Sequence, residues 1–598
     1  MKIVIMTIPL RNATGGTPFG SLAIIQSLRE AGYDPYFLDV DTLRHTFPEV
    51  VGFFEQYKPD VIGISAVVST SYAYTRDISH ALRKILPNVR IVIGGNLCAS
   101  AEVLLRSCQV DACVLAEGEY IIRDLLAYYA LHSRILENYT ALKGIKGLVF
   151  LDEDGEVFNT GYARQLSPEE IRTPDMSIIE EFSNIEKIIS PKPCGFITSD
   201  PRSLEPHRAG KREGIVFASK GCINRCTFCH RWDKGMRTLS PEKVLEQISY
   251  LQQHHNVGFF RFADECFGAH KKKTAELVAE LKKLDILWTV GGVRVDTVDT
   301  ETLQTWKDAG CTAVNYGIES GSPTILVQME KNISLEQNFR GIDDLANTGL
   351  DSVLQLVIGM PAESPDTIKE TGRLIHYFIN KTRRAVVSIN FAQALPGTPL
   401  YEYDRAIGLI GHGWREEEAY LIRVFNKNAA DHSALTNHTQ YSLISLRCWM
   451  YLLYQEVERA KKLYLGAPQV PTGCALFYAI WLHSSGAVVR LVKRALKPVA
   501  PEFIAAAEIP FNEADIGRSP LLYPFRAYLN FLIVLRDLYR LEGAAKTLGH
   551  LWEHIGKSFH GLLREQQPAI DLRKTVGGIS QLPSSRSEAS MEPLRRGR

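Results

Sequence analysis

The sequence has no excess of charge of either sign. Its 598 residues include 68 Lys and Arg against 67 Asp and Glu, which gives a formal net charge of +1. A balanced chain creates no long-range field that would draw it to a polyanion. We therefore expect no nucleic-acid partner, and the charge indicates no other partner either.

Long hydrophobic runs are also missing. The N-terminal stretch from Met1 to Pro9 is too short an apolar run for a signal peptide and is typical of a first buried strand. No uninterrupted apolar segment is long enough to cross a bilayer. We therefore expect a cytoplasmic protein without a transmembrane segment. The length predicts about three domains, each with its own core.

The sequence shows no paired cysteine pattern. Eleven cysteines, an odd number scattered singly apart from one loop, argue against a disulfide framework, so we expect reduced thiols. Cys266 and Cys311 lie near predicted strands, and buried structural cysteine is the expected state of both.

One loop departs from this scattered pattern. Cys222, Cys226 and Cys229 stand in C-x-x-x-C-x-x-C spacing. Three thiolates can converge on one soft metal centre, and a 4Fe-4S cluster would keep one iron open for a chelating small molecule. The alternative is a zinc site or a set of structural thiols. It is disfavoured because structural zinc requires four ligands in two pairs, no second C-x-x-C pair exists, and His230 directly adjoins Cys229.

The loop Ser219-Lys-Gly-Cys-Ile-Asn-Arg-Cys-Thr-Phe-Cys-His230 resembles that of the radical S-adenosylmethionine enzymes. In that family the amino and carboxylate groups of S-adenosylmethionine occupy the fourth cluster position. Electron transfer into the sulfonium then gives a 5'-deoxyadenosyl radical. The resemblance implies that the three cysteines hold a 4Fe-4S cluster and that Phe228 packs near it.

Residues 1–135 alternate apolar strands with amphipathic helices. Strands are expected at 2–7, 34–38, 61–66, 90–94 and 112–116, which is typical of a doubly wound α/β domain with a parallel sheet. Such sheets bind ligands at the carboxyl ends of their strands. The candidate residues at these ends are Gly16, Thr17, Gly20, Ser65, Ser69, Thr70, Gly94, Gly95, Glu117, Gly118 and Glu119.

Taken singly, these glycines are explained by tight βα turns. Their joint order resembles the cobalamin-binding domain that precedes the radical core in many of these enzymes, which implies that the candidate residues contact cobalamin. The chain lacks the Asp-x-His-x-x-Gly motif that supplies a histidine to cobalt in the methionine-synthase type. The lower cobalt ligand is therefore unassigned. The alternative is a domain that has kept the fold and lost cobalamin.

Residues 136–212 are predicted to form an irregular connector with a hairpin at 148–159. Residues 213–408 alternate strand and helix again, with strands expected at 214–218, 257–262, 288–293, 313–317, 352–358 and 385–392. These six βα units predict a partial TIM-type barrel whose reactive groups lie at the carboxyl-end loops. The polar residues near these ends are Asp264, Glu265, Arg294, Asp296, Glu319, Ser320 and Gln355.

The resemblance assigns S-adenosylmethionine binding to this set. It implies that Asp264 or Glu265 accepts hydrogen bonds from the ammonium group. Polar groups on strands four and five would hold the carboxylate and ribose, and they comprise Glu319, Ser320 and Gln355. A buried ammonium needs acceptors and a buried carboxylate needs donors, so the assignment is physically reasonable.

Arg294 has two equally supported interpretations, a contact to S-adenosylmethionine or a salt bridge to Asp296 without a ligand. The segments 317–321, 359–363 and 395–401 match motifs of this enzyme branch in the expected order. The resemblance covers about the first two-thirds of the chain.

Residues 409–577 are expected to form a helical domain, with amphipathic segments at 442–464, 475–496 and 524–542. Residues 578–598 have the composition of a disordered tail. The aromatic residues expected to pack between helices are Trp449, Tyr451, Tyr454, Phe477, Tyr478, Trp481, Phe525 and Tyr528.

These features predict an enzyme with a 4Fe-4S cluster, S-adenosylmethionine and cobalamin, whose difficult chemistry belongs to the cofactors. The leading hypothesis is radical methylation of an unactivated carbon, or of phosphorus, in a small-molecule or lipid substrate, with a flavodoxin- or ferredoxin-type electron donor. Alternatives are radical rearrangement, cyclisation or oxidation without methyl transfer, and a non-catalytic cobalamin or redox sensor. The sequence identifies no catalytic base.

Overall fold

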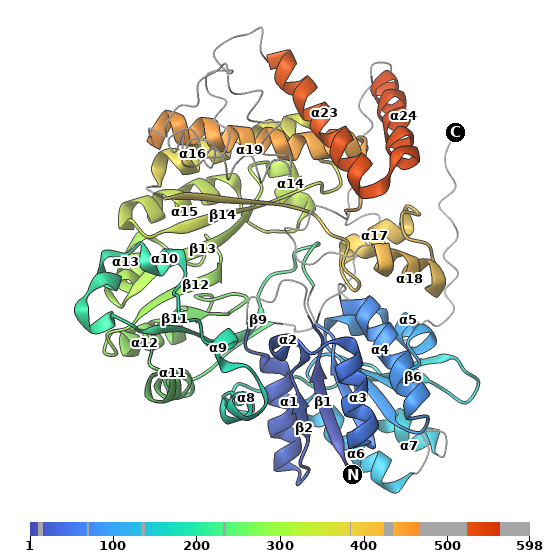
Figure 1. The fold of residues 1–598 in the computed structure, drawn as a ribbon. Coiled ribbons are helices and arrows are strands. Elements are labelled where there is room, and N and C mark those ends of the chain that lie inside the picture. Colours follow the sequence, from blue (N-terminus) through green and yellow to red (C-terminus); the bar gives the residue numbers. More distant parts are fainter. Residues whose placement is uncertain are drawn as a thin grey trace, which may run out of the picture.

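The computed structural model describes residues 1–9, 16–67, 71–132, 138–230, 235–382, 384–423, 435–465 and 523–561. Two sheets and a set of C-terminal helices make up this part of the chain (Figure 1). None of the described helices is both long enough and apolar enough to cross a membrane.

The first sheet has seven strands in the order β2-β1-β3-β4-β5-β6-β7. Its first five strands are mutually parallel, and each matches a predicted strand. They are β1 (Ile3–Thr7), β2 (Tyr36–Leu38), β3 (Val61–Ser65), β4 (Arg90–Gly94) and β5 (Ala112–Val114). The doubly wound parallel architecture expected from the sequence is thereby confirmed.

Helices cover both faces of this sheet because its side chains alternate between two cores. In β1, Ile3 and Ile5 belong to one apolar cluster, whereas Val4 and Met6 belong to the other. The surrounding helices are α1 (Phe19–Glu30), α2 (Val40–Leu43), α3 (Phe47–Tyr57), α4 (Tyr72–Ile85), η2 (Asn96–Ser100), α5 (Ala101–Ser107) and α6 (Glu119–Leu131).

The predicted hairpin is formed by β6 (Leu148–Leu151) and β7 (Val157–Asn159), which pair antiparallel. The sequence placed it in the connector, but β6 also pairs antiparallel with β5 and extends the first sheet. Other short helices between the sheets are α7 (Tyr139–Gly144), α8 (Ser177–Phe182), α9 (Ile185–Ile188), α10 (Gly195–Thr198), η4 (Pro201–Leu204) and η5 (Pro206–Arg208).

The second sheet has six parallel strands in the order β15-β14-β13-β12-β11-β8, which confirms the half-barrel. Its strands are β8 (Arg212–Val216), β11 (Val257–Phe262), β12 (Leu287–Val293), β13 (Cys311–Glu319), β14 (Ser352–Ile358) and β15 (Ala385–Phe391). Its helices are α11 (Pro241–His255), α12 (Lys271–Leu281), α13 (Thr300–Asp308), α14 (Pro323–Gln328), α15 (Leu335–Thr348) and α16 (Pro365–Lys381).

Local sequence signals begin and end these helices. Ser364 caps α16 by accepting a hydrogen bond from the backbone N–H of Thr367 at 3.3 Å, and Pro365 occupies the first turn. At the other end of the neighbouring helix α15, Gly349 adopts a left-handed conformation with φ of 64°.

The cysteine loop lies outside the half-barrel sheet. It connects β9 (Ser219–Cys222) with β10 (Gly235–Thr238), and these two strands form a separate antiparallel hairpin. Figure 1 shows β9 between the half-barrel and the N-terminal domain. The sequence predicted the loop but not this hairpin.

The described elements beyond β15 are helical, as expected for the residues after 408. They are α17 (Pro399–Ala406), α18 (Trp414–Arg423), α19 (Leu443–Leu465), α23 (Tyr523–Glu542) and α24 (Ala544–Gly561). Helix α19 packs on α16 and adds Trp449 to the half-barrel core. Tyr451 packs on a small separate cluster, whereas Tyr454 is 37% exposed. The predicted helix at 475–496 and the predicted tail at 578–598 lie outside the described residues.

Candidate functional site

The three cysteines of the loop differ in their surroundings. Cys222 ends β9 and is half-buried, Cys226 is buried and Cys229 is exposed. Asn224 fixes the middle of the loop, because its amide nitrogen donates to Cys226 Sγ at 3.0 Å and to the backbone oxygen of Lys331 at 2.9 Å. The loop is thereby tied to the turn that precedes α15.

A fourth thiol lies beside this loop. Cys266 follows β11, is fully buried, and donates a hydrogen bond to Cys222 that lowers the pKa of Cys222 to about 6. The same contact raises the pKa of Cys266. A lowered pKa favours the thiolate that metal binding requires. Cys266 and Cys311 are both buried, as predicted, but the sequence did not indicate that Cys266 adjoins the loop.

The donor set fits an iron–sulfur cluster. Three cysteine thiols on one loop provide soft ligands, and thiolate is the usual ligand of such clusters. Phe228 is half-buried and packs against the second apolar cluster, together with side chains of the N-terminal domain.

The two carboxyl groups that follow β11 have different environments. Asp264 is buried, and it accepts hydrogen bonds from Ser219 Oγ at 2.5 Å and from the backbone N–H of Ala218 at 3.1 Å. Burial raises the pKa of Asp264 to about 6. Glu265 is exposed. Asp264 therefore already holds the start of β9, whereas the Glu265 carboxylate is accessible from solvent.

Glu319 ends β13 and forms a buried ion pair with Lys331, whose Nζ lies 3.1 Å from Glu319 Oε1. Burial would lower the pKa of Lys331, but the Glu319 carboxylate outweighs it and raises this pKa overall. A Cβ on Gly317 would lie 2.6 Å from Glu319 Oε1 and 2.9 Å from Lys331 Nζ. The motif glycine at this position therefore leaves room for the pair. The sequence indicated Glu319 but missed Lys331.

Arg294 forms the salt bridge that the sequence offered as one of two interpretations. Its guanidinium donates to both carboxylate oxygens of Asp296, at 2.9 and 2.8 Å, and to the backbone oxygen of Lys331 at 3.2 Å. Arg294 thus connects the end of β12 to the same turn that Asn224 contacts.

The remaining predicted residues of the half-barrel lie on strand ends or on its inner face. Ser320 is buried, and its Oγ accepts from the backbone N–H of Ser322 at 3.1 Å. Gln355 is exposed on β14, whereas its chain neighbours Leu354 and Leu356 are buried in the core. Because strand side chains alternate, Gln355 faces away from the helical layer.

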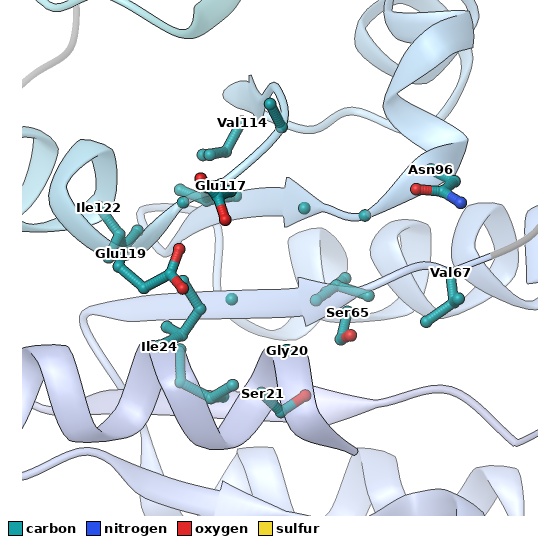
Figure 2. A pocket seen from close by; sticks show the side chains of 18 of the residues that line it. Gly20, Ser21, Ile24, Ser65, Val67, Asn96, Val114, Glu117, Glu119 and Ile122 are labelled. Atoms are coloured by element: carbon teal, nitrogen blue, oxygen red, sulfur yellow. The ribbon is translucent and has the colours of Figure 1, made fainter. Parts of the chain in front are cut away.

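A cavity of about 310 Å³ opens at the carboxyl edge of the first sheet. It lies where β1 and β3 are neighbours although β2 comes between them in sequence, which is the position where doubly wound sheets bind ligands. The predicted residues that line it are Gly20, Ser65, Gly94, Gly95, Glu117, Gly118 and Glu119 (Figure 2). Gly16 and Thr17 do not line it, and Ser69 and Thr70 lie outside the described residues.

The cavity wall suits a large ligand of mixed polarity. Gly95 has φ of 98°, and Gly94 has no atom within 4 Å of where a Cβ would be, so backbone approaches the cavity closely. The hydroxyl of Ser21 is buried at the cavity without a hydrogen-bond partner among the described residues. The apolar part of the wall consists of Ile5, Ile24, Ile64, Val67, Val92, Val114, Ala116 and Ile122. These residues fit the cofactor that the resemblance implies.

Family models match two separate stretches of the chain. The model of the radical SAM superfamily matches residues 216–375, which contain the cysteine loop and most of the half-barrel. The model of the B12 binding domain matches residues 12–126, which contain most of the residues that line the cavity.

The sequence is also similar to curated proteins. An uncharacterized methyltransferase of Pyrococcus horikoshii is 29% identical over 70% of this chain and 86% of its own length. The anaerobic magnesium-protoporphyrin IX monomethyl ester cyclase of Rubrivivax gelatinosus is 28% identical over 58% of this chain and 60% of its own length. The cytidylyl-2-hydroxyethylphosphonate methyltransferase of Streptomyces wedmorensis is 24% identical over 58% of this chain and 69% of its own length.

Solved structures share the fold. The radical S-adenosylmethionine methyltransferase TsrM from Kitasatospora setae, solved with cobalamin and a [4Fe-4S] cluster, has a TM-score of 0.53 at 17% identity over 69% of this chain and 76% of its own. The cobalamin-dependent S-adenosylmethionine radical enzyme OxsB, solved with aqua-cobalamin and S-adenosylmethionine, has a TM-score of 0.52 at 17% identity. The match covers 96% of this chain and 83% of that one.

Proposed function

We propose that this chain, which joins a B12-binding domain to a radical SAM domain and has cobalamin-dependent radical SAM enzymes as its relatives, is a radical methyltransferase. The observation that carries the proposal is the coexistence of the three-thiol loop and the cobalamin-type cavity in one chain. Four of the similar curated proteins are named as methyltransferases or methylases.

We assign the cluster to Cys222, Cys226 and Cys229, and cobalamin to the cavity. When bound, the cluster supplies the electron that cleaves S-adenosylmethionine, and cobalamin carries the methyl group. The chain itself prepares both sites. Asn224 orients the Cys226 thiol, and the contact with Cys266 favours the Cys222 thiolate.

The residues near the loop provide acceptors and donors for S-adenosylmethionine. Glu265 is the more accessible of the two carboxylates after β11, so we assign the ammonium contact to Glu265 and a supporting role to Asp264. Lys331 lies next to Glu319, in the turn that Asn224 and Arg294 both contact, and we add it to the proposed binding residues. Gln355 and Ser320 remain proposed contacts of the ribose and carboxylate.

The proposed reaction has a defined balance. The substrate loses one hydrogen atom and gains one methyl group, while two molecules of S-adenosylmethionine and two electrons are consumed. One molecule each of 5'-deoxyadenosine, methionine and S-adenosylhomocysteine is released. A flavodoxin- or ferredoxin-type donor would supply the electrons, and the substrate would be a small molecule or a lipid.

A second function has a specific observation in its favour. Two similar proteins are anaerobic magnesium-protoporphyrin IX monomethyl ester cyclases, at 28% and 26% identity. A cyclisation, rearrangement or oxidation would use the same two cofactor sites. It would release 5'-deoxyadenosine without S-adenosylhomocysteine, so the products distinguish the two functions.

The test is an anaerobic assay of the reconstituted full-length protein. The protein is reconstituted with iron, sulfide and hydroxocobalamin, reduced, and given S-adenosylmethionine with a deuterated methyl group and a metabolite and lipid extract. We expect 5'-deoxyadenosine, S-adenosylhomocysteine and a deuterium-labelled methyl product in equal amounts. Formation of 5'-deoxyadenosine alone would favour the non-methylating alternative.

Two cysteine variants separate the chemistry from folding. Cys226→Ala removes a proposed cluster ligand, so it should lose both nucleoside products and most of its bound iron. Cys194→Ala removes a half-buried thiol outside the loop and should retain both. Normal iron content and activity in Cys226→Ala would exclude the proposed cluster site.

A further inference from the structure

The hairpin that carries the cysteine loop also reaches the cobalamin-type cavity. Lys220 lies on β9, two positions before Cys222, and pairs in register with Arg237 on β10. Both side chains are cationic and both meet carboxylates of the N-terminal domain. The hairpin is therefore in direct contact with both proposed cofactor sites.

The carboxylates belong to Glu117 and Glu119, which flank the start of α6. Arg237 Nη1 lies 2.6 Å from Glu117 Oε2, and Lys220 Nζ lies 3.5 Å from an oxygen of each glutamate. The side chains of Glu117, Glu119 and Arg237 are at most 10% exposed. Water therefore screens these charges weakly, and their mutual positions are energetically important.

Glu117 and Arg237 are further fixed by the backbone of Leu166. The N–H of Leu166 donates to Glu117 Oε2 at 2.8 Å, and its carbonyl oxygen accepts from Arg237 Nη1 at 3.0 Å. These three residues form a closed set of contacts. The Lys220 side chain is 28% exposed, which is more than any of the other three charged side chains of this network.

The same residues form part of the cavity wall. Glu117, Glu119 and Lys220 all line the cavity, and Figure 2 shows the two carboxylates at the end opposite Val67 and Asn96. A ligand that fills this cavity must therefore meet the side chains that hold the hairpin. Cys222, the first cysteine of the loop, lies two residues after Lys220 on β9.

We propose that Glu117, Glu119, Lys220 and Arg237 form an ionic link that transmits occupancy of the cobalamin cavity to the cluster loop. They act as positioning residues, because they hold the hairpin rather than contact the reacting atoms. This inference rests on the cofactors of the proposed function. It also changes the role of Glu117 and Glu119, which the sequence assigned to cobalamin binding alone.

A contact between the N-terminal domain and another element, α18, provides a control. Glu418 on α18 accepts hydrogen bonds from Tyr72 at 2.6 Å and from Ser107 at 3.0 Å, which belong to α4 and α5. Glu418 neither lines the cavity nor contacts the hairpin through any recorded interaction of the described residues. Its removal should weaken domain contact without breaking the link.

The experiment measures the cluster, not turnover. The full chain is reconstituted with iron and sulfide only and then titrated anaerobically with hydroxocobalamin, whose binding is followed by visible absorption. The midpoint potential and the electron paramagnetic resonance spectrum of the cluster are recorded before and after. Neither S-adenosylmethionine nor substrate is present, so failure of methylation would not affect the result.

In the wild-type protein we expect cobalamin to shift both the potential and the spectrum. Lys220→Met and Glu119→Gln should bind iron normally and lose most of this shift, whereas Glu418→Gln should retain it. The charge-conserving variant Lys220→Arg should keep most of the shift, because it retains a cation beside both glutamates.

Several outcomes would overturn the inference. They are a wild-type cluster that does not respond to bound cobalamin, charge-removing variants that respond like the wild type, and a Lys220→Arg variant that loses the shift as Lys220→Met does. Absence of cobalamin binding to the wild type in the absorption titration would instead refute the cofactor assignment, and with it this inference.

Discussion

At the scale of single residues, close packing determines the chemistry near the cysteine loop. Gly317, Glu319 and Lys331 show this, because the buried ion pair occupies the space that a side chain at position 317 would need. Lys331 of this pair also belongs to the turn that Asn224 and Arg294 contact. A methyl group added at this point therefore acts on several proposed ligand contacts at once.

Gly317→Ala should disturb the ion pair, since its Cβ would lie 2.6 Å from Glu319 Oε1. We expect a loss of about 1–3 kcal/mol of unfolding free energy and weaker S-adenosylmethionine binding. Thermal unfolding and equilibrium binding measure the two effects. Gly291→Ala on β12 is the matched control, because a Cβ there meets nothing within 4 Å. Equal behaviour of the two variants would contradict the proposed packing.

A buried carboxyl group in the half-barrel should make stability depend on pH. Burial raises the pKa of Glu363 from its ordinary value of 4.5 to about 7. Between these values the folded protein holds a proton that the unfolded chain has lost, so stability falls as pH rises through this window. The shift corresponds to at most about 3 kcal/mol.

The variant Glu363→Gln keeps a neutral hydrogen-bonding group at this position. Its thermal midpoint should therefore change less between pH 5 and pH 8 than that of the wild type, by about the contribution of one carboxyl group. Asp366→Asn alters an exposed carboxylate at the start of α16, three residues further along the chain, and should behave like the wild type. An unchanged pH dependence in Glu363→Gln would show that another group is responsible.

At the scale of elements, strand order creates the sites. The cavity exists because β1 and β3 are neighbours, which brings the ends of β1, β3, β4 and β5 to one edge of the first sheet. The cysteine loop, by contrast, is carried by a two-stranded hairpin outside both larger sheets. That hairpin can therefore contact both domains.

Gly94 at the end of β4 tests the cavity directly. A Cβ at this position meets no atom within 4 Å, and Gly94 lines the cavity, so Gly94→Leu should fold normally and fill ligand space. We expect cobalamin affinity to fall about tenfold or more, which is about 1.4 kcal/mol. Gly52→Leu on α3 is equally unobstructed but lies outside the cavity wall, and it should bind cobalamin normally. Wild-type cobalamin affinity in Gly94→Leu would show that cobalamin does not bind in this cavity.

At the scale of the whole molecule, the B12-binding domain contacts the rest of the chain in several separate places, and two of these contacts involve the hairpin β9–β10 and α18. The hairpin β9–β10 meets it at the cavity, and α18 meets it at α4 and α5 (Figure 1). Two separated contacts restrict relative rotation more effectively than one. The arrangement suits a reaction that requires two cofactors to keep a fixed relative position.

Glu418→Ala should weaken the second of these contacts. It removes the acceptor for Tyr72 and Ser107, so amide hydrogen exchange should become faster in α18 and at the start of α4, with little change in β11 and β12. The control is Arg415→Ala, which alters an exposed residue of the same helix. Unchanged exchange in Glu418→Ala would show that apolar packing alone holds this contact.

Much of the architecture followed from local patterns in the sequence. The strands of both sheets were predictable because buried parallel strands are short apolar runs between amphipathic helices, as at Val61–Ser65 and Val257–Phe262. Hairpin β6–β7 was also predicted, from the turn sequence Asp154-Gly155, but its place in the first sheet was not. Whether an edge strand joins one sheet or another depends on which surface it covers.

The sequence by itself determined the two cofactor domains and the three candidate cluster thiols, because these are local spacings and motifs in a fixed order. Only the tertiary structure decided that Cys266 adjoins Cys222, that Lys331 pairs with Glu319, and that Lys220 and Arg237 reach the cavity. These contacts join residues far apart in the chain. They form where strand order and burial bring complementary groups together, and no local pattern records that convergence.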